Sequence, residues 1–213
     1  MTEHQLTVTR TARYFQAGEI GPHTRHLWLV CHGYGQLAGY FVRHFAARTA
    51  ADPGTVVVAP EGLSRFYLQG TEGRVGASWM TRDDRLAEID DHCAYLSQLL
   101  GSLQSQAGSN LTITVLGFSQ GTATVGRWLV RSGVRPARLV LWAGGFPDDL
   151  DEATVRVALA GLPVTLVAGA ADEYVSGAQV AALQARLTAL GAVVDVRVFA
   201  GGHTLDAATL AGL

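Results

Sequence analysis

The sequence predicts an α/β protein with one mostly parallel, twisted sheet that is covered by helices on both faces. Short apolar runs rich in β-branched residues recur along the chain, and amphipathic stretches with helical spacing lie between them. Each run is apolar at nearly every position, which is typical of strands buried on both faces. Because strands that alternate with helices form parallel sheets, these patterns together predict the fold class.

The predicted strands are the runs at residues 27–30, 55–59, 111–116, 139–142, 164–167 and 193–199. Apolar side chains at three- and four-residue spacing predict helices near residues 86–100 and 180–190. Ser176 and Gln179 have the spacing of a capping box, which predicts that the second of these helices starts just after the fifth strand.

Three further segments shape the prediction. Residues 6–9 and 12–15 follow one another without room for a crossover helix, so they predict an antiparallel hairpin at the sheet edge. Residues 61–85 form a long connection rich in aromatic side chains, and loops of that length are usually functional. Residues 143–163 have room for a loop and one short helix, so we expect no inserted cap domain.

Length and composition reduce the number of possible classes of function. A chain of 213 residues can bury one sizeable core, and we expect a single domain over residues 1–213. A net charge of -2 without a basic run argues against nucleic-acid binding. Hydrophobic residues make up 48% and charged residues 16%, which favours an apolar cleft or self-association, for example as a homodimer. Without an apolar leader or membrane span, a cytoplasmic location is expected.

The strongest chemical signal is Gly117-Phe118-Ser119-Gln120-Gly121, which fits the G-x-S-x-G pattern. The bare pattern is weak in a chain with 25 glycines, but here it lies between a predicted strand and a predicted helix. That context is typical of a nucleophile elbow, in which a strained turn presents the serine hydroxyl to a cleft. We therefore expect Ser119 to be a nucleophile.

A nucleophilic serine needs a base, and chain order selects His203 among the seven histidines. In hydrolases with this elbow the order is Ser, then Asp or Glu, then His, each after a strand at the carboxyl edge of the sheet. Only His203 follows Ser119, and it comes directly after the last predicted strand. Its glycine neighbours Gly201 and Gly202 allow a loop to turn the imidazole inwards.

The acid of the set follows the strand at residues 164–167, where Asp172 is our choice. Its carboxylate would accept the Nδ1 proton of His203 and stabilise the imidazolium. Four other acidic residues stay open as alternatives, because one is adjacent to Asp172 and the other three follow the strand at residues 139–142. They are Glu173, Asp148, Asp149 and Asp151.

The oxyanion formed during acyl transfer needs two backbone donors. The first is expected to be the N–H of Gln120, the residue after the nucleophile. The second is expected in the early loop His32-Gly33-Tyr34-Gly35, with Tyr34 as the donor and His32 ordering the loop. Cys31 lies at the end of an apolar run, and we expect its thiol to be buried and inert.

The HGYG, GFSQG, GAAD and GGH segments resemble the acyl-protein thioesterase and carboxylesterase/phospholipase family of α/β-hydrolases over nearly the whole chain. The resemblance implies a hydrolase fold without a cap and the site residues Ser119, Asp172, His203, Tyr34 and Gln120. It also implies that Trp79 lines an acyl site. Gln36 replaces an acidic residue usual in the family, and Met80-Thr81 replaces an aromatic and an acid, so a small-molecule esterase is expected before a protein depalmitoylase.

The expected substrate is a small acyl ester or thioester with a short to medium acyl chain. Its acyl group would rest on apolar side chains near the catalytic edge, which are Tyr34, Trp79, Met80, Phe118 and Phe146. No cofactor and no metal are expected, because no His, Cys or carboxylate pair shows ligand spacing beside the glycine loops. Two alternatives stay open. They are a non-catalytic receptor with a hydrolase pocket and a dinucleotide-binding protein with a phosphate loop at residues 33–39.

Overall fold

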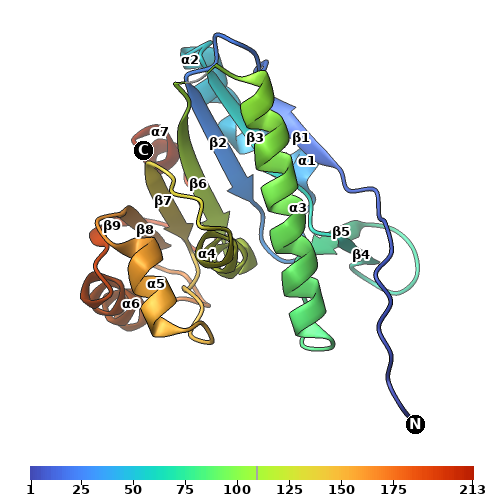
Figure 1. The fold of residues 1–213 in the computed structure, drawn as a ribbon. Coiled ribbons are helices and arrows are strands. Elements are labelled where there is room, and N and C mark those ends of the chain that lie inside the picture. Colours follow the sequence, from blue (N-terminus) through green and yellow to red (C-terminus); the bar gives the residue numbers. More distant parts are fainter. Residues whose placement is uncertain (109) are drawn as a thin grey trace.

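In the computed structural model, which describes residues 1–108 and 110–213, a seven-stranded sheet runs through the protein in the order β1-β3-β2-β6-β7-β8-β9 (Figure 1). Its strands are β1 (Tyr14–Ala17), β2 (His26–Cys31), β3 (Thr55–Pro60), β6 (Thr112–Phe118), β7 (Arg138–Trp142), β8 (Pro163–Gly169) and β9 (Val193–Phe199). All pairings in this sheet are parallel except that of β1 with β3. The predicted α/β class is therefore confirmed.

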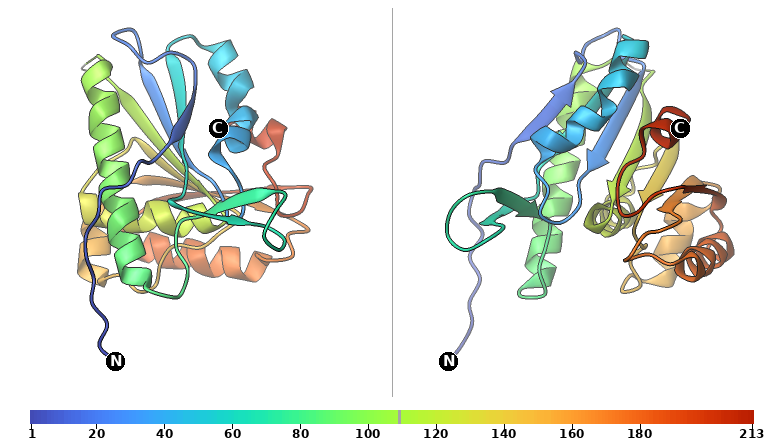
Figure 2. Two further views of the ribbon diagram at one scale, coloured as in Figure 1. Left: turned by 90° about the vertical axis from the view of Figure 1, so that its right-hand side faces the viewer. Right: turned by 180° about the vertical axis from the view of Figure 1, so that it is seen from behind.

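Helices cover both faces of the sheet. They are α1 (Ala38–Phe41), the 3-10 helix η1 (Val42–Phe45), α2 (Ala46–Ala51), α3 (Arg85–Gln106), α4 (Gln120–Ser132), α5 (Glu152–Leu159), α6 (Gly177–Ala189) and α7 (Ala207–Ala211). The long helix α3 crosses in front of the sheet in Figure 1, and the view from behind in Figure 2 shows α1, α2 and α7 on the opposite face.

The core has two halves, one on each face. Along β2, Leu27 and Leu29 pack with α3, α4, α5 and α6, whereas Trp28 and Val30 pack with α1, η1 and α7. Successive side chains of a strand point to opposite faces, and both sets are buried here. This explains why the strands are almost continuously apolar in sequence.

The N-terminal edge is antiparallel as predicted, but the partner strands differ from the predicted pair. Residues 14–17 form β1 and pair with β3, and residues 6–9 form neither a strand nor a helix. Leu6 and Val8 are 86% and 72% exposed, so an ordered strand there would bury too little apolar surface to offset its loss of entropy.

The two long connections differ in content. The 61–85 connection contains a hairpin of β4 (Ser64–Tyr67) and β5 (Val75–Ser78), which the sequence reading missed. The 143–163 connection contains α5 and no other helix or strand, as its length predicts.

The expected capping box is present, since Ser176 Oγ accepts from the Gln179 N–H at 3.3 Å and Gln179 Oε1 accepts from the Ser176 N–H at 2.8 Å.

The strand order reverses beside β2 and thereby positions the candidate site. After β3, on one side of β2, the chain crosses to β6 on the other side and then continues outward to β9. In open α/β sheets, ligands bind outside the carboxyl ends of the strands at such a switch point. The loops after β2 and β6, which begin at His32 and Ser119, meet there.

Candidate active site

Ser119 occupies a strained turn between β6 and α4. Its φ and ψ are 52° and -117°, a conformation that non-glycine residues rarely adopt. The flanking glycines make the turn possible: a Cβ on Gly117 would lie 2.4 Å from the Gly121 oxygen, and a Cβ on Gly121 would lie 2.2 Å from the Cys31 oxygen. The G-x-S-x-G spacing therefore reflects close backbone packing on both sides of the serine.

Ser119, His203 and Asp172 form one hydrogen-bonded line. His203 Nε2 lies 2.9 Å from Ser119 Oγ, and His203 Nδ1 lies 2.9 Å from Asp172 Oδ2. A carboxylate only accepts, so Nδ1 carries the ring proton and Nε2 presents its lone pair to the serine hydroxyl. The structure brings together all three residues that chain order selected.

Asp172 is held as a carboxylate by its surroundings. Its side chain is fully buried, and Oδ1 accepts hydrogen bonds from the N–H groups of Tyr174 at 2.8 Å and Val175 at 3.1 Å. Burial raises the pKa of Asp172, but the hydrogen bonds from Tyr174, His203 and Val175 outweigh it and hold the pKa below its usual value. The residue that faces His203 is therefore ionised across the neutral range.

The alternative acids lie elsewhere. Asp149 pairs with Arg127 at 2.9 Å and also with Arg85, and Asp151 caps α5 by accepting from the Thr154 N–H at 2.8 Å. Both Asp148 and Glu173 are exposed. Among the residues described, Asp172 is the only acidic residue with a hydrogen bond to His203.

The early loop lies directly against the serine. A Cβ on Gly33 would be 3.2 Å from Ser119 Cβ, and the Gly35 N–H is anchored to the Ala77 oxygen at 2.9 Å. Gln36 Oε1 accepts from the Gly33 N–H at 2.8 Å. The side-chain amide of Gln36 therefore accepts a hydrogen bond from the loop backbone, as a carboxylate at the same position could. Tyr34 lies between these anchored residues, and its role as an oxyanion donor stays a prediction.

His32 orders this loop. Its Nε2 accepts from the Gly62 N–H at 3.0 Å, which leaves Nδ1 protonated and donating to the Gly33 oxygen at 2.8 Å. Burial lowers the pKa of His32, so the ring stays neutral. With both ring nitrogens occupied, His32 is not available as a base.

Gln120 occupies the first position of α4, where a backbone N–H has no partner within its own helix. Its side chain ties the elbow to the end of β5: Oε1 accepts from the Trp79 N–H at 3.1 Å, and Nε2 donates to the Met80 oxygen at 2.8 Å. Sequence reasoning assigned only the backbone of Gln120. The N–H as an oxyanion donor stays a prediction, and the side chain holds it in place.

Of the five predicted acyl-contact residues, Tyr34 is exposed, and the other four are not gathered into one patch. Trp79 and Phe146 are 2% and 5% exposed and belong to the half-core beneath α3 and α4, whereas Phe118 is 3% exposed on the other face. Phe118 does pack 5.2 Å from the His203 ring, centroid to centroid, and Met80 is half-buried. Their burial leaves a ligand little surface to touch.

Two exposed aromatic rings lie on loops of the candidate site. Tyr174 is 67% exposed and packs edge-on at 4.8 Å from the His203 ring, and Tyr34 is 60% exposed and packs 5.0 Å from Phe66. The sequence reading missed Tyr174, although its position two residues after Asp172 places it on the same loop.

Three further observations concern the part of the chain that the structure describes. No three His, Cys, Asp or Glu side chains there form a group that could hold a metal ion. No helix in that part is both long and apolar enough to span a bilayer. Cys31 is buried, and burial raises the pKa of its thiol well above the usual range, so it stays protonated.

Comparisons with known proteins agree with this fold. A family model described as Phospholipase/Carboxylesterase matches residues 19–212. A search of curated proteins found no match. Among solved structures, esterase PE8 is 20% identical with a TM-score of 0.73, over 95% of this chain and 99% of that one.

Two further solved structures share the fold. Acyl-protein thioesterase 2 from Zea mays is 19% identical with a TM-score of 0.70, over 95% of this chain and 96% of that one. A carboxylesterase from Mesorhizobium loti is 24% identical with a TM-score of 0.68, over 93% and 92% of the two chains. With a family match over nearly its full length and a serine elbow at the switch point of its sheet, the chain belongs to the phospholipase/carboxylesterase family of α/β-hydrolases.

Proposed function

We propose that the protein is a serine hydrolase that cleaves small carboxylic esters and thioesters through an acyl-enzyme on Ser119. The observation that carries this proposal is the line from Ser119 Oγ through His203 to Asp172, with 2.9 Å at each step. We propose further that residues 1–213 act as one domain, since a single sheet carries all three residues.

In the first half-reaction, His203 Nε2 takes the hydroxyl proton as Ser119 Oγ attacks the substrate carbonyl. The carbonyl oxygen becomes an oxyanion, which the N–H groups of Tyr34 and Gln120 would bind. Asp172 stabilises the imidazolium through Nδ1. The alcohol or thiol then leaves with the proton from His203, and the acyl group stays on the serine oxygen.

In the second half-reaction, His203 takes a proton from water, and the hydroxide attacks the acyl-enzyme. Collapse of the second oxyanion releases the carboxylic acid and returns the proton to Ser119 Oγ. Every proton is held by His203 between steps, so Ser119, His203, Asp172 and the two backbone donors suffice, and we propose no cofactor and no metal ion.

The test is hydrolysis of p-nitrophenyl butyrate and of a butyryl thioester by the wild type and by Ser119→Ala and His203→Ala. We expect wild-type turnover of both substrates, unchanged by EDTA, and a loss of about 10⁴-fold in kcat in either variant. Near-wild-type activity of Ser119→Ala, or activity that EDTA abolishes and zinc restores, would overturn the proposal. A wild type that binds esters without turnover would favour the non-catalytic receptor.

A further inference from the structure

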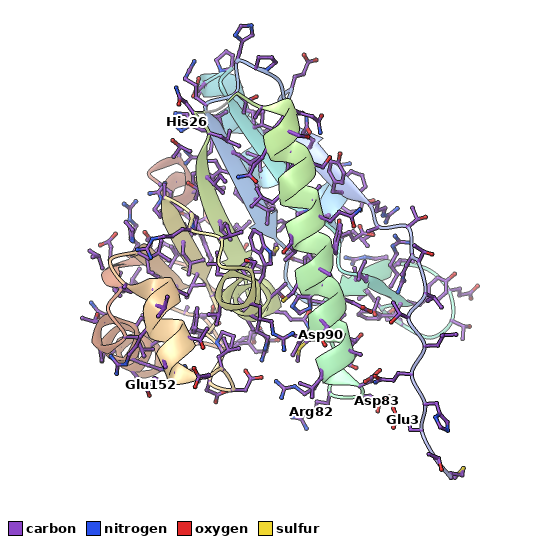
Figure 3. The ribbon with its side chains drawn as sticks, in the orientation of Figure 1. Glu3, His26, Arg82, Asp83, Asp90 and Glu152 are labelled. Carbon is purple, nitrogen blue, oxygen red and sulfur yellow. The ribbon has the colours of Figure 1, made fainter. Side chains whose placement is uncertain are left out.

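A cavity lies at the opposite end of the sheet from Ser119. Its volume is about 590 Å³, and it opens over the amino ends of β2, β3, β6 and β7, between α2 and α7. In Figure 3 the labelled His26, the first residue of β2, lies at this upper end near α2. A six-residue strand spans about 20 Å, so β2 separates the cavity from the loop that it carries at its carboxyl end.

The floor of the cavity is polar where the rest of this face is apolar. Thr55, His26 and Thr112 are register partners across three strands. In the next row of the same face, Trp28 faces Thr114, which in turn faces Arg138. Further along the strands this face carries buried apolar side chains, namely Val30, Leu116, Val140 and Trp142.

The walls of the cavity are lined by small residues. The residues that α2 and α7 turn towards the cavity include four alanines, whose short side chains do not fill it: Ala47, Ala51, Ala207 and Ala211. A sheet face in an α/β protein is normally closed by an apolar helix surface. Here small residues on the walls leave room above a floor that carries hydroxyl groups.

Two arginines that have no Asp or Glu partner among the described residues face this space. The guanidinium carbon of Arg48 lies 4.1 Å from the Trp28 ring centroid, and that of Arg138 lies 5.5 Å from the same centroid. Within residues 1–108 and 110–213, no Asp or Glu side chain lies within 4.0 Å of either guanidinium. The one acid that lines the cavity, Asp52, is already paired with Arg25 at 2.8 Å.

Most of the donors on these arginines are unused. Arg48 Nη2 donates to the Leu210 oxygen at 2.6 Å, and Arg138 Nη2 donates to the main-chain oxygen of Leu213. Arg48 Nε is buried without any hydrogen-bond partner, which costs free energy. Burial, followed by repulsion from Arg138, also lowers the pKa of Arg48. An anion bound beside Arg48 would offset this repulsion.

We propose that this cavity is a binding site for a small organic anion that carries a phosphate or carboxylate group. Arg48 and Arg138 hold the charged oxygens, because guanidinium forks match both groups. The exposed hydroxyl of Thr112 supplies a further hydrogen bond. The site is separate from the proposed esterase centre and does not depend on it.

The test is titration calorimetry at constant ionic strength in chloride buffer, with inorganic phosphate, glycerol 3-phosphate and succinate as probes. We expect at least one probe to bind the wild type with a millimolar or lower Kd. Arg48→Gln and Arg138→Gln should each weaken that binding by roughly tenfold, since each removes a charge-assisted contact. Arg156→Gln is the matched control, because Arg156 pairs with Glu152 on α5, on the other face.

Thr112→Val provides a second variant that preserves side-chain shape and charge, and it should weaken binding several-fold. An unchanged circular dichroism spectrum and urea midpoint verify that each variant is folded. Binding of phosphates alone, or of succinate alone, supports the site and identifies the anionic group. Two results would overturn the proposal: no binding of any probe at a concentration of about 20 mM, or equal weakening of binding by Arg156→Gln. The two arginines would then serve only as caps for the end of α7.

Discussion

Asp172 determines how His203 can act, because its carboxylate fixes which ring nitrogen carries the proton. Asp172→Asn replaces an acceptor by an amide that can present its N–H to Nδ1, which would move the ring proton to Nε2 and face Ser119 with a donor. We expect kcat for a short ester to fall by roughly 10⁴-fold. Glu173→Gln is the control, since Glu173 is exposed.

A variant Asp172→Asn with near-wild-type turnover, together with a large loss in Glu173→Gln, would show that the acid has been assigned to the wrong residue. The pH response adds a second readout. Since the pKa of Asp172 is lowered in the folded protein, its contribution to stability is present above its unfolded pKa of about 3.9 and is lost as the pH falls through the folded pKa.

Gly121 tests the packing of the elbow. A Cβ there would lie 2.2 Å from the Cys31 oxygen and 2.8 Å from the His32 oxygen, so Gly121→Ala must push the elbow away from the early loop. We expect a loss of about 1–3 kcal/mol in the free energy of unfolding and a large loss of activity. Urea denaturation and ester hydrolysis measure the two effects.

Gly145→Ala is the matched control, because nothing lies within 4 Å of the added methyl group and its φ is not in the left-handed region. It should leave both stability and activity close to the wild type. If Gly121→Ala were as mild as Gly145→Ala, the close approach of the elbow to β2 would be contradicted.

At the residue scale, the line of three side chains was predictable because chain order and strand position restrict each member. Only one histidine follows Ser119, and Asp172 follows the strand directly before the one that leads to His203. The contacts of Tyr174 with His203 and of the Gln120 side chain with Met80 were not predictable. They depend on where a loop and a hairpin from other parts of the chain pack, which no local pattern encodes.

At the element scale, the connection from β7 to β8 bears on substrate size. It contains α5 and no other helix or strand, so this connection supplies no cap to enclose a long acyl chain. Each methylene adds about 0.8 kcal/mol of binding only while it is removed from water. We expect kcat/KM for p-nitrophenyl esters to peak at short to medium acyl lengths. A steady rise from acetate to palmitate, or a jump above the micelle threshold, would contradict this expectation.

The elements themselves differ in how well sequence predicts them. The six parallel strands were predicted because burial on both faces makes them continuously apolar. Strands β4 and β5 were missed because they are short and their burial alternates or is incomplete, so the hairpin depends on pairing with itself and on packing under the early loop. Conversely, the β-branched run at residues 6–9 has no partner edge and forms no strand.

At the scale of the whole molecule, buried neutral histidines make stability depend on pH. Burial lowers the pKa of His92 to about 4, and its Nε2 has no hydrogen-bond partner. Between about 6.5 and 4 the unfolded chain binds a proton at His92 that the folded chain does not, so stability falls as the pH falls. Over pH 7 to 5 this loss amounts to about 2 kcal/mol.

His92→Leu removes that titration, so its free energy of unfolding should vary less with pH than that of the wild type by about 2 kcal/mol over the same interval. His4→Gln is the control, since His4 is exposed. Urea denaturation at pH 7, 6 and 5 makes the comparison. Parallel curves for the wild type and His92→Leu would show that His92 does not titrate differently in the folded state.

The central claim is that Ser119 is an activated nucleophile, and covalent labelling tests it most directly. A fluorophosphonate reacts with a serine only when a base removes its proton and an oxyanion site receives the phosphoryl oxygen. We predict stoichiometric labelling of the wild type, located by peptide mass spectrometry on Ser119, and none in Ser119→Ala. Labelling of the wild type at another residue, or no labelling while the fold is intact, would contradict the account.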